Sequence, residues 1–293
     1  MSGSVADLRA RAHLHAALGQ PGSGRLRYAA AMHFHRQGKL SDAVLEVYRI
    51  CSPQDGEDPA GLLATRGLTL DLPPPDAPDL ALRLLIDEVD RYLSGLGGPG
   101  IAEVRSRIAV WRDGPLALPV PASNAVVADH LAPALATLFG THPALAGAIA
   151  DAAPGLDWIT YDLYPPEKIG ADFLTGHAYT SLIGPAAPVR ADEFDLGLFL
   201  VAPHVLYRDH AHPAPELYAP LTGPHGWRFG PGTPLIVKPA HEPVWNPPDA
   251  PHMTKIGPVP FLCIFGWTKD VMLPARVLPA ADWAELEALR IGE

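Results

Sequence analysis

Residues 210–218 read His-Ala-His-Pro-Ala-Pro-Glu-Leu-Tyr, and this stretch decides how the chain is interpreted. In extended backbone its polar side chains all fall on even positions, which places them on one face of a sheet: His210, His212, Glu216 and Tyr218. Imidazole and carboxylate together suit a divalent ion such as Zn, Fe, Mn, Ni or Co, and no thiolate lies nearby to form a structural zinc site. The segment therefore predicts one divalent transition metal ion in an open site of the catalytic kind.

A fourth ligand is expected from His252, which ends the proline-rich turn at 246–251 and precedes an apolar strand. The distance in sequence from His212 allows the chain to return to the same sheet face through a few short strands. Two further pairs share the His-x-His spacing, His13 with His15 and His33 with His35. These pairs lie in segments of helical period, where positions i and i+2 do not face each other, so we do not expect them to bind metal.

The pattern formed by His210, His212, Glu216 and Gly223, followed by Pro251-His252, resembles the two metal motifs of the cupin superfamily. This chain departs from the usual motifs at turn positions and keeps the ligands. His204 and Asp249 stand where glycine is usual, and Ile256 stands where asparagine is frequent.

Within the cupins, residues 157–275 resemble the bacterial dimethylsulfoniopropionate lyases. The features that carry this resemblance are Tyr207, Tyr218, the strand Phe261–Trp267 and the upstream segments 169–173 and 197–201. The resemblance implies a carbon-sulfur lyase that cleaves dimethylsulfoniopropionate to dimethyl sulfide and acrylate, with a metal ion that stabilises charge on the substrate carboxylate.

The resemblance also implies roles for two tyrosines. Tyr218 would be the base, because an adjacent cation can stabilise a phenolate that is otherwise a poor base at neutral pH. Tyr207 would help to orient or deprotonate the substrate. It has odd parity relative to the ligands, so it reaches the site only if a bend or bulge lies near Arg208-Asp209.

A sulfonium group carries positive charge without hydrogen-bond donors, which favours an aromatic wall. Trp267, Trp245 and Trp227 are the candidates for substrate binding, and Trp267 is favoured by its position. For Trp227 and Trp245 a place in the core is the stronger alternative.

The apolar period changes near residue 155, from recurrence every three or four residues to short runs bounded by Pro and Gly. We therefore expect an α+β protein with a C-terminal cupin double-stranded antiparallel β-barrel of the jelly-roll type and an N-terminal all-helical region. The expected parts are a helical region at 1–154, the barrel with the metal site at 155–275, and a C-terminal helix packing on the barrel within 276–293. The helical region could pack on the barrel, form a homodimer interface or cover the pocket.

The composition of the chain limits the kinds of molecule it is expected to bind. A net charge of -10 leaves no basic stripe for nucleic acid or an anionic membrane, so the expected partner is a small-molecule carboxylate substrate. Two distant cysteines give no disulfide framework, and no run is long and apolar enough for a membrane span, which together favour the cytoplasm.

Two alternatives stay open. A cupin metalloenzyme could catalyse another reaction, as a dioxygenase or an isomerase, and oxygen consumption would indicate it. A non-catalytic small-molecule-binding cupin is the other, and it would show no turnover with any metal.

Overall fold

The computed structural model describes residues 5–75 and 77–292, which form two compact units divided at residue 80. The first unit is helical, and its core gathers apolar residues such as Phe34 and Val47. The helices in this part are α1 (Val5–Leu14), α2 (Ser23–Arg36), α3 (Asp42–Cys51) and α4 (Pro59–Thr65). His33 contacts the carboxylate of Asp7 at 2.7 Å, and His35 contacts that of Asp42 at 2.6 Å.

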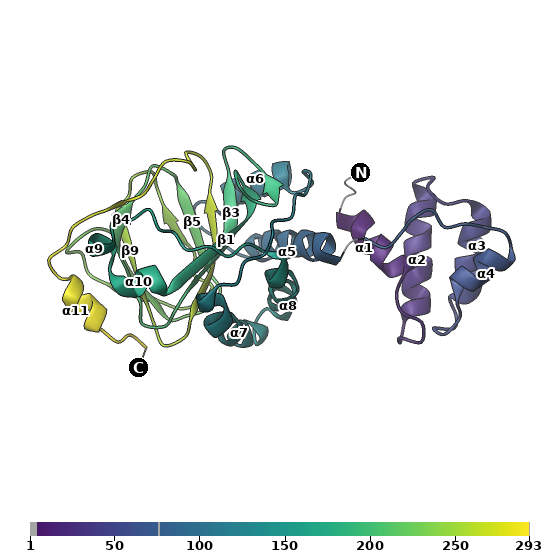
Figure 1. Ribbon diagram of the computed structural model, residues 1–293, viewed down its shortest axis with the longest axis horizontal. Helices are drawn as coiled ribbons and strands as arrows, with labels where there is room; N and C mark the ends of the chain where they lie inside the picture. The colour runs from purple at the N-terminus through teal and green to yellow at the C-terminus, as the bar shows by residue number, and fades with distance from the viewer. Residues whose placement is uncertain (1–4, 76, 293) are drawn as a thin grey trace. The chain divides into compact units, whose positions relative to one another are not determined.

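The second unit contains two sheets that face each other. The six-stranded sheet has the order β2-β1-β3-β10-β5-β8, and the five-stranded sheet has the order β11-β4-β9-β6-β7. Neighbours are antiparallel except β1 and β2. The strands are β1 (His177–Gly184), β2 (Val189–Arg190), β3 (Asp195–Val201), β4 (Leu206–Ala211), β5 (Glu216–Pro220), β6 (His225–Arg228), β7 (Ile236–Lys238), β8 (Val244–Asn246), β9 (His252–Ile256), β10 (Phe261–Trp267) and β11 (Arg276–Val277). In Figure 1, β4 and β9 lie on one side of this unit, and β1, β3 and β5 lie on the other.

Side-chain alternation gives the six-stranded sheet two different faces. Leu198 and Leu200 of β3 point outward, whereas Phe199 and Val201 point toward the five-stranded sheet and share a core with its Trp227. The expected α+β architecture with a C-terminal cupin jelly-roll is confirmed by this arrangement.

Helices cover the outer face of the six-stranded sheet, with α7 packed on β3, β1 and β10 (Figure 1). They are α5 (Ala77–Ser94), α6 (Ile101–Trp111), α7 (Ala125–Phe139) and α8 (Pro143–Ala152). Their apolar faces form one continuous core with the strands, for example through Leu85, Ile108 and Leu135. The compact unit therefore begins at Ala81, upstream of the expected division at residue 154. A change of period marks where strands begin, and it does not reveal which helices pack on them.

Short helical segments complete the unit: η1 (Ala153–Gly155), α9 (Pro166–Ile169), α10 (Ala171–Thr175) and α11 (Trp283–Ala288). The C-terminal α11 lies against β4. Its Trp283 donates a 2.8 Å hydrogen bond to Asp209, and the guanidinium of Arg208 lies 4.6 Å from the Trp283 ring. Over residues 5–75 and 77–292, no helix has the length and apolar character needed to cross a membrane.

Candidate metal centre and substrate pocket

The segment 210–218 passes from one sheet to the other. β4 ends at Ala211 in the five-stranded sheet, and β5 begins at Glu216 in the six-stranded sheet. Pro213 and Pro215 lie between them, where proline cannot continue a ladder of backbone hydrogen bonds. The expectation that these side chains share one face of a single sheet is wrong. They instead approach a common interior from two facing sheets.

A buried histidine cluster forms where the sheets meet. His210 of β4 lies opposite His252 of β9 in the strand register, and His212 follows β4 directly. One ligand nitrogen from each of these residues lies within 4.8 Å of the others. Glu216 faces the cluster, with its Oε2 atom 2.9 Å from His212 Nε2 and 3.4 Å from His252 Nε2. The structure thus brings together all the ligands expected from the sequence.

Each ring of the cluster is oriented by its other nitrogen. The Nδ1 atoms lie 2.8 to 2.9 Å from backbone carbonyl oxygens, that of His210 near Arg208, that of His212 near Ala214 and that of His252 near Ala250. A ring that donates its Nδ1 proton to a carbonyl keeps a lone pair on Nε2, which is the tautomer of a metal ligand.

The buried Nε2 atom of His210 has no hydrogen-bond partner, and that of His252 forms no hydrogen bond, with Glu216 Oε2 3.4 Å away. Buried polar atoms are seldom left in this state, so these two nitrogens indicate a missing partner at the centre of the cluster. An ion that accepts nitrogen and carboxylate ligands fits this donor set.

Electrostatics agree with that fit. Burial lowers the pKa of His210 well below its ordinary value, and neighbouring His252 and His212 lower it further, so this ring is neutral at pH 7. Burial would raise the pKa of Glu216, but the interactions with His212 and His252 outweigh it and hold the pKa below its ordinary value. The carboxylate is therefore ionised and the His210 ring is available as a ligand.

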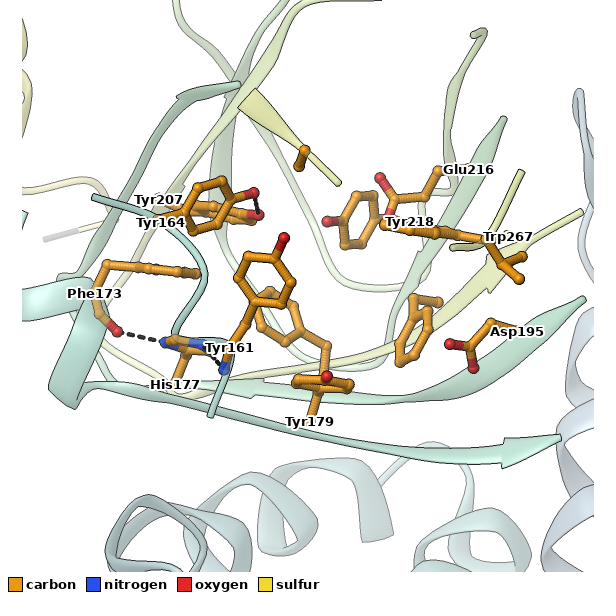
Figure 2. A pocket seen from close by; sticks show the side chains of 14 residues that line it. Tyr161, Tyr164, Phe173, His177, Tyr179, Asp195, Tyr207, Glu216, Tyr218 and Trp267 are labelled. Carbon is orange, nitrogen blue, oxygen red and sulfur yellow. Dashed lines mark hydrogen bonds between the residues drawn. The ribbon is translucent and has the colours of Figure 1, made fainter. Parts of the chain in front are cut away.

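Tyr207 reaches the interior through the irregularity expected near Arg208-Asp209. In the register of β4 and β9, Tyr207 lies opposite Thr254 and His210 lies opposite His252, so β4 has one extra residue between these positions. The Tyr207 ring stacks on His210 with 3.9 Å between centroids, and its hydroxyl lies 2.6 Å from that of Tyr164 (Figure 2).

A cavity of about 160 Å³ opens beside the cluster. Its lining is mostly aromatic and consists of Tyr161, Tyr164, Phe173, His177, Tyr179, Asp195, Phe199, Tyr207, Glu216, Tyr218, Phe265, Trp267, Val271 and Ala275. Glu216 and Tyr207 belong both to this lining and to the contacts of the cluster. A molecule in the cavity would therefore lie next to any ion held by the histidines.

Tyr218 and Trp267 occupy the wall near Glu216 (Figure 2). Burial, then the charge of Glu216, raises the pKa of Tyr218 well above its ordinary value. Trp267 donates its indole N–H to Glu216 Oε1 at 2.7 Å and stacks on His212 with 4.5 Å between centroids. Trp267 thus orients the carboxylate and also faces the cavity.

The other two tryptophan candidates are placed elsewhere. Trp245 of β8 packs against the outer core, close to Gly100. Trp227 is fully buried behind Tyr218, with 5.1 Å between the ring centroids, and is absent from the cavity lining. Both positions agree with the core alternative for these residues.

Several lining residues were not expected from the sequence, notably Tyr164, Tyr179 and Asp195. Tyr179 and Asp195 are brought to the histidine motif by the register of β1, β3 and β10, whereas Tyr164 comes from the loop before α9. Segment 169–173, one of the features that carried the family resemblance, does contribute to the pocket. Its Phe173 stacks on Tyr207 with 4.0 Å between centroids.

The two turn positions where glycine is usual keep a glycine-like backbone. His204 has φ 63° and Asp249 has φ 58°, in the left-handed region that favours glycine. The Asp249 N–H donates to the carbonyl of His212 at 2.9 Å, which ties the second turn to the cluster. Both residues therefore adopt the backbone conformation that favours glycine, although neither is glycine.

Facing sheets that enclose a histidine centre define this protein as a cupin. The chain belongs to the dimethylsulfoniopropionate lyase family, because the model of that family matches residues 104–263, more than half of its length.

Comparison with individual proteins agrees. The curated dimethylsulfoniopropionate lyase DddQ of Ruegeria pomeroyi is 29% identical over 108 residues, which is 37% of this chain. This chain spans about half, 53%, of the length of that relative.

The crystal structure of DddQ from the same organism superposes with a TM-score of 0.53 at 22% identity, over 68% of this chain and 96% of that one. A chain from the crystal structures of the lyases RdDddP and RnDddQII gives a TM-score of 0.52 at 21% identity, over 69% of this chain and 100% of that one. At these identities the two structures establish the shared fold.

Proposed function

We propose that this protein is a metal-dependent carbon-sulfur lyase that cleaves dimethylsulfoniopropionate to dimethyl sulfide and acrylate. The observation that carries the proposal is the meeting of the histidine cluster with two phenols, Tyr207 and Tyr218, at one largely aromatic cavity. Family membership supports the choice of substrate.

The proposed ligands are His210, His212, His252 and Glu216, which would hold one divalent ion of Zn, Fe, Mn, Ni or Co. When bound, the ion would supply Lewis-acid stabilisation of the negative charge that develops on the substrate carboxylate. The orientation of the rings by backbone carbonyls means that little rearrangement is needed for the nitrogens to face such an ion.

The proposed base is Tyr218. It lines the cavity on the same strand as Glu216 and two positions further on, so both side chains point inward. Burial and the charge of Glu216 raise the pKa of Tyr218, so its base form requires the positive charge that the proposed ion would supply beside it. The phenolate oxygen then accepts the α-proton, and the electron pair of the Cα–H bond becomes the second bond between Cα and Cβ. The Cβ–S bond breaks, its electron pair leaves with sulfur as neutral dimethyl sulfide, and the proton on Tyr218 is later lost to water.

Tyr207 is proposed to position the substrate. Its ring is fixed between His210 and Phe173, which stack on it at 3.9 and 4.0 Å. Burial, then the neighbouring Tyr164, raises the pKa of Tyr207 well above its ordinary value, so its hydroxyl stays protonated and acts as a hydrogen-bond donor. The hydroxyl of Tyr164 fixes the direction of that donor.

The aromatic walls would serve the leaving group. The substrate is a zwitterion, and the reaction removes its positive charge as sulfur leaves in neutral dimethyl sulfide. Apolar rings such as Phe265 and Phe199 exclude the water that would stabilise the separated charges of the bound substrate.

The test is headspace detection of dimethyl sulfide, with acrylate measured in parallel, from purified protein whose metal content is known. We expect equal amounts of both products, and their loss in His252→Ala and Tyr218→Phe. Tyr218→Phe should retain its metal, whereas His252→Ala should not. Tyr92→Phe is the matched control, because Tyr92 is equally buried but lies in α5 and bonds His241 at 2.9 Å, away from the cavity.

Turnover that survives Tyr218→Phe would contradict the role of that residue. Absence of both products from the metal-loaded wild type would overturn the substrate assignment and leave the histidine cluster to another reaction.

A further inference from the structure

The cavity is lined by two carboxylates whose surroundings differ. Glu216 is engaged by His212, His252 and Trp267. Asp195 lies on the opposite side of Trp267 and has a buried Oδ1 atom with no hydrogen-bond partner. Within the described residues no Lys or Arg pairs with Asp195, and Ser181 is the side chain that bonds it. Such a carboxyl, facing a cavity, indicates a partner that comes from outside the chain.

The strand register places Asp195 in line with the catalytic groups. Asp195 of β3 lies opposite Trp267 of β10, which lies opposite Glu216 of β5. Strands in a sheet are about 4.8 Å apart, so the backbones of Asp195 and Glu216 are separated by roughly 10 Å. Figure 2 shows Asp195 on the Trp267 side of the pocket, with Tyr164 and Tyr207 at the other end.

Aromatic rings line the same cavity as the carboxyl of Asp195. Tyr179 and Phe265 meet edge to face with 6.2 Å between centroids, and Trp267 forms the adjoining wall. Burial, then the charge of Asp195, raises the pKa of Tyr179 to about 12. Aromatic faces attract cations that have no hydrogen-bond donors, and a carboxylate behind them adds the counter-charge.

We propose that Asp195, with Tyr179, Phe265 and Trp267, forms the subsite that selects the donor-free onium group of the substrate. This inference rests on the proposed function for the identity of the substrate. A short carboxylate with a terminal onium group would place its carboxylate toward the histidine cluster and its cationic end toward Asp195.

Burial raises the pKa of Asp195 to about 7, although the hydrogen bond from Ser181 opposes the shift. A bound cation would favour the ionised form of Asp195. The carboxylate would therefore carry more negative charge in the complex than in the free protein, which strengthens its attraction for the cation.

The test uses a pair of ligands with the same shape and different charge, neither of which can release a sulfide. 3-(Trimethylammonio)propanoate carries the onium, and 4,4-dimethylpentanoate is its neutral carbon analogue. Calorimetric titration of the metal-loaded wild type should give tighter binding of the onium ligand by roughly tenfold or more. Equal affinity for the two ligands in the wild type would overturn the proposal without any variant.

Asp195→Asn should weaken the onium ligand by roughly tenfold and leave the neutral analogue unchanged, at unchanged metal content. Asp195→Glu keeps the charge and should keep the preference. The matched control is Asp192→Asn, an exposed acid just upstream, which should bind both ligands as the wild type does.

A purely structural role would weaken both ligands equally in Asp195→Asn, and that result would refute the subsite. The binding assay is independent of turnover. A wild type without preference for the onium ligand would refute the subsite. A wild type that prefers the onium ligand but produces no dimethyl sulfide would refute the proposed reaction alone.

Discussion

Two buried histidines outside the metal cluster make the larger unit sensitive to acid. The Nε2 atom of His177 accepts the backbone N–H of Tyr161 at 3.0 Å, and the Nδ1 atom of His225 accepts the indole N–H of Trp227 at 2.7 Å. Protonation would destroy these acceptors. Burial lowers the pKa of each histidine to about 4.

The sign of the effect follows from proton uptake. Between the unfolded value near 6.5 and the folded value near 4, the unfolded chain binds more protons than the folded one, so stability falls as pH falls. Each histidine then costs about 2 kcal/mol of stability at pH 5 relative to pH 7, and the pair costs about 4 kcal/mol.

The measurement is urea unfolding of metal-free protein at several pH values from 7.5 to 5. Tryptophan fluorescence is a suitable probe, because all six tryptophans belong to the unit that starts at Ala81. His177→Gln keeps an acceptor and cannot titrate, so it should reduce the loss of stability between pH 7 and pH 5 by about 2 kcal/mol. His130→Gln on α7, a partly exposed position, is the control and should leave the loss unchanged. An identical pH dependence in wild type and His177→Gln would refute the reasoning.

Three more predictions concern packing and the metal. Arg228→Met leaves Asp209 buried without the bidentate partner it has in the wild type, and should lower the free energy of unfolding by about 3–5 kcal/mol in urea titrations. Gly197→Ala places a methyl group against the backbone carbonyl of Thr180 and 2.6 Å from the Phe265 ring, so it should lower the melting temperature and narrow the cavity, seen as weaker binding of both onium and neutral ligands. Divalent metal added to chelator-treated wild type should raise the melting temperature by an amount that grows with metal concentration, and the rise should be absent in His252→Ala; a rise of equal size in that variant would count against His252 as a ligand.

The histidine cluster could be predicted because most of its ligands are close in sequence. His210, His212 and Glu216 lie within one short segment, and the bulge that admits Tyr207 followed from the parity of its position. The comparison with the cupin motifs also identified His204 and Asp249 as turn positions. Both residues adopt positive φ, as a glycine at such a turn would.

The rest of the pocket could not be predicted, because it depends on pairing between distant strands. Asp195 and Tyr179 come from β3 and β1, and no local pattern states that β3 will pair with β10 in a register that brings Asp195 opposite Trp267. The error about segment 210–218 has a similar cause. Period-2 alternation fixes relative side-chain direction within a strand, but it does not reveal where the chain leaves one sheet for another.

The charges of the cavity lining determine which part of a substrate each group can hold. The lining contains Asp195 and Glu216 and, among the described residues, no Lys or Arg, so a substrate carboxylate has no cationic side chain to bind there. Its attraction must come from the histidine end, and a loss of metal should therefore weaken every carboxylate ligand, charged or neutral at its other end. Asp195 acts only on the cationic end. The two losses are separable by the same pair of ligands, because metal removal reduces both affinities whereas Asp195→Asn reduces the difference between them.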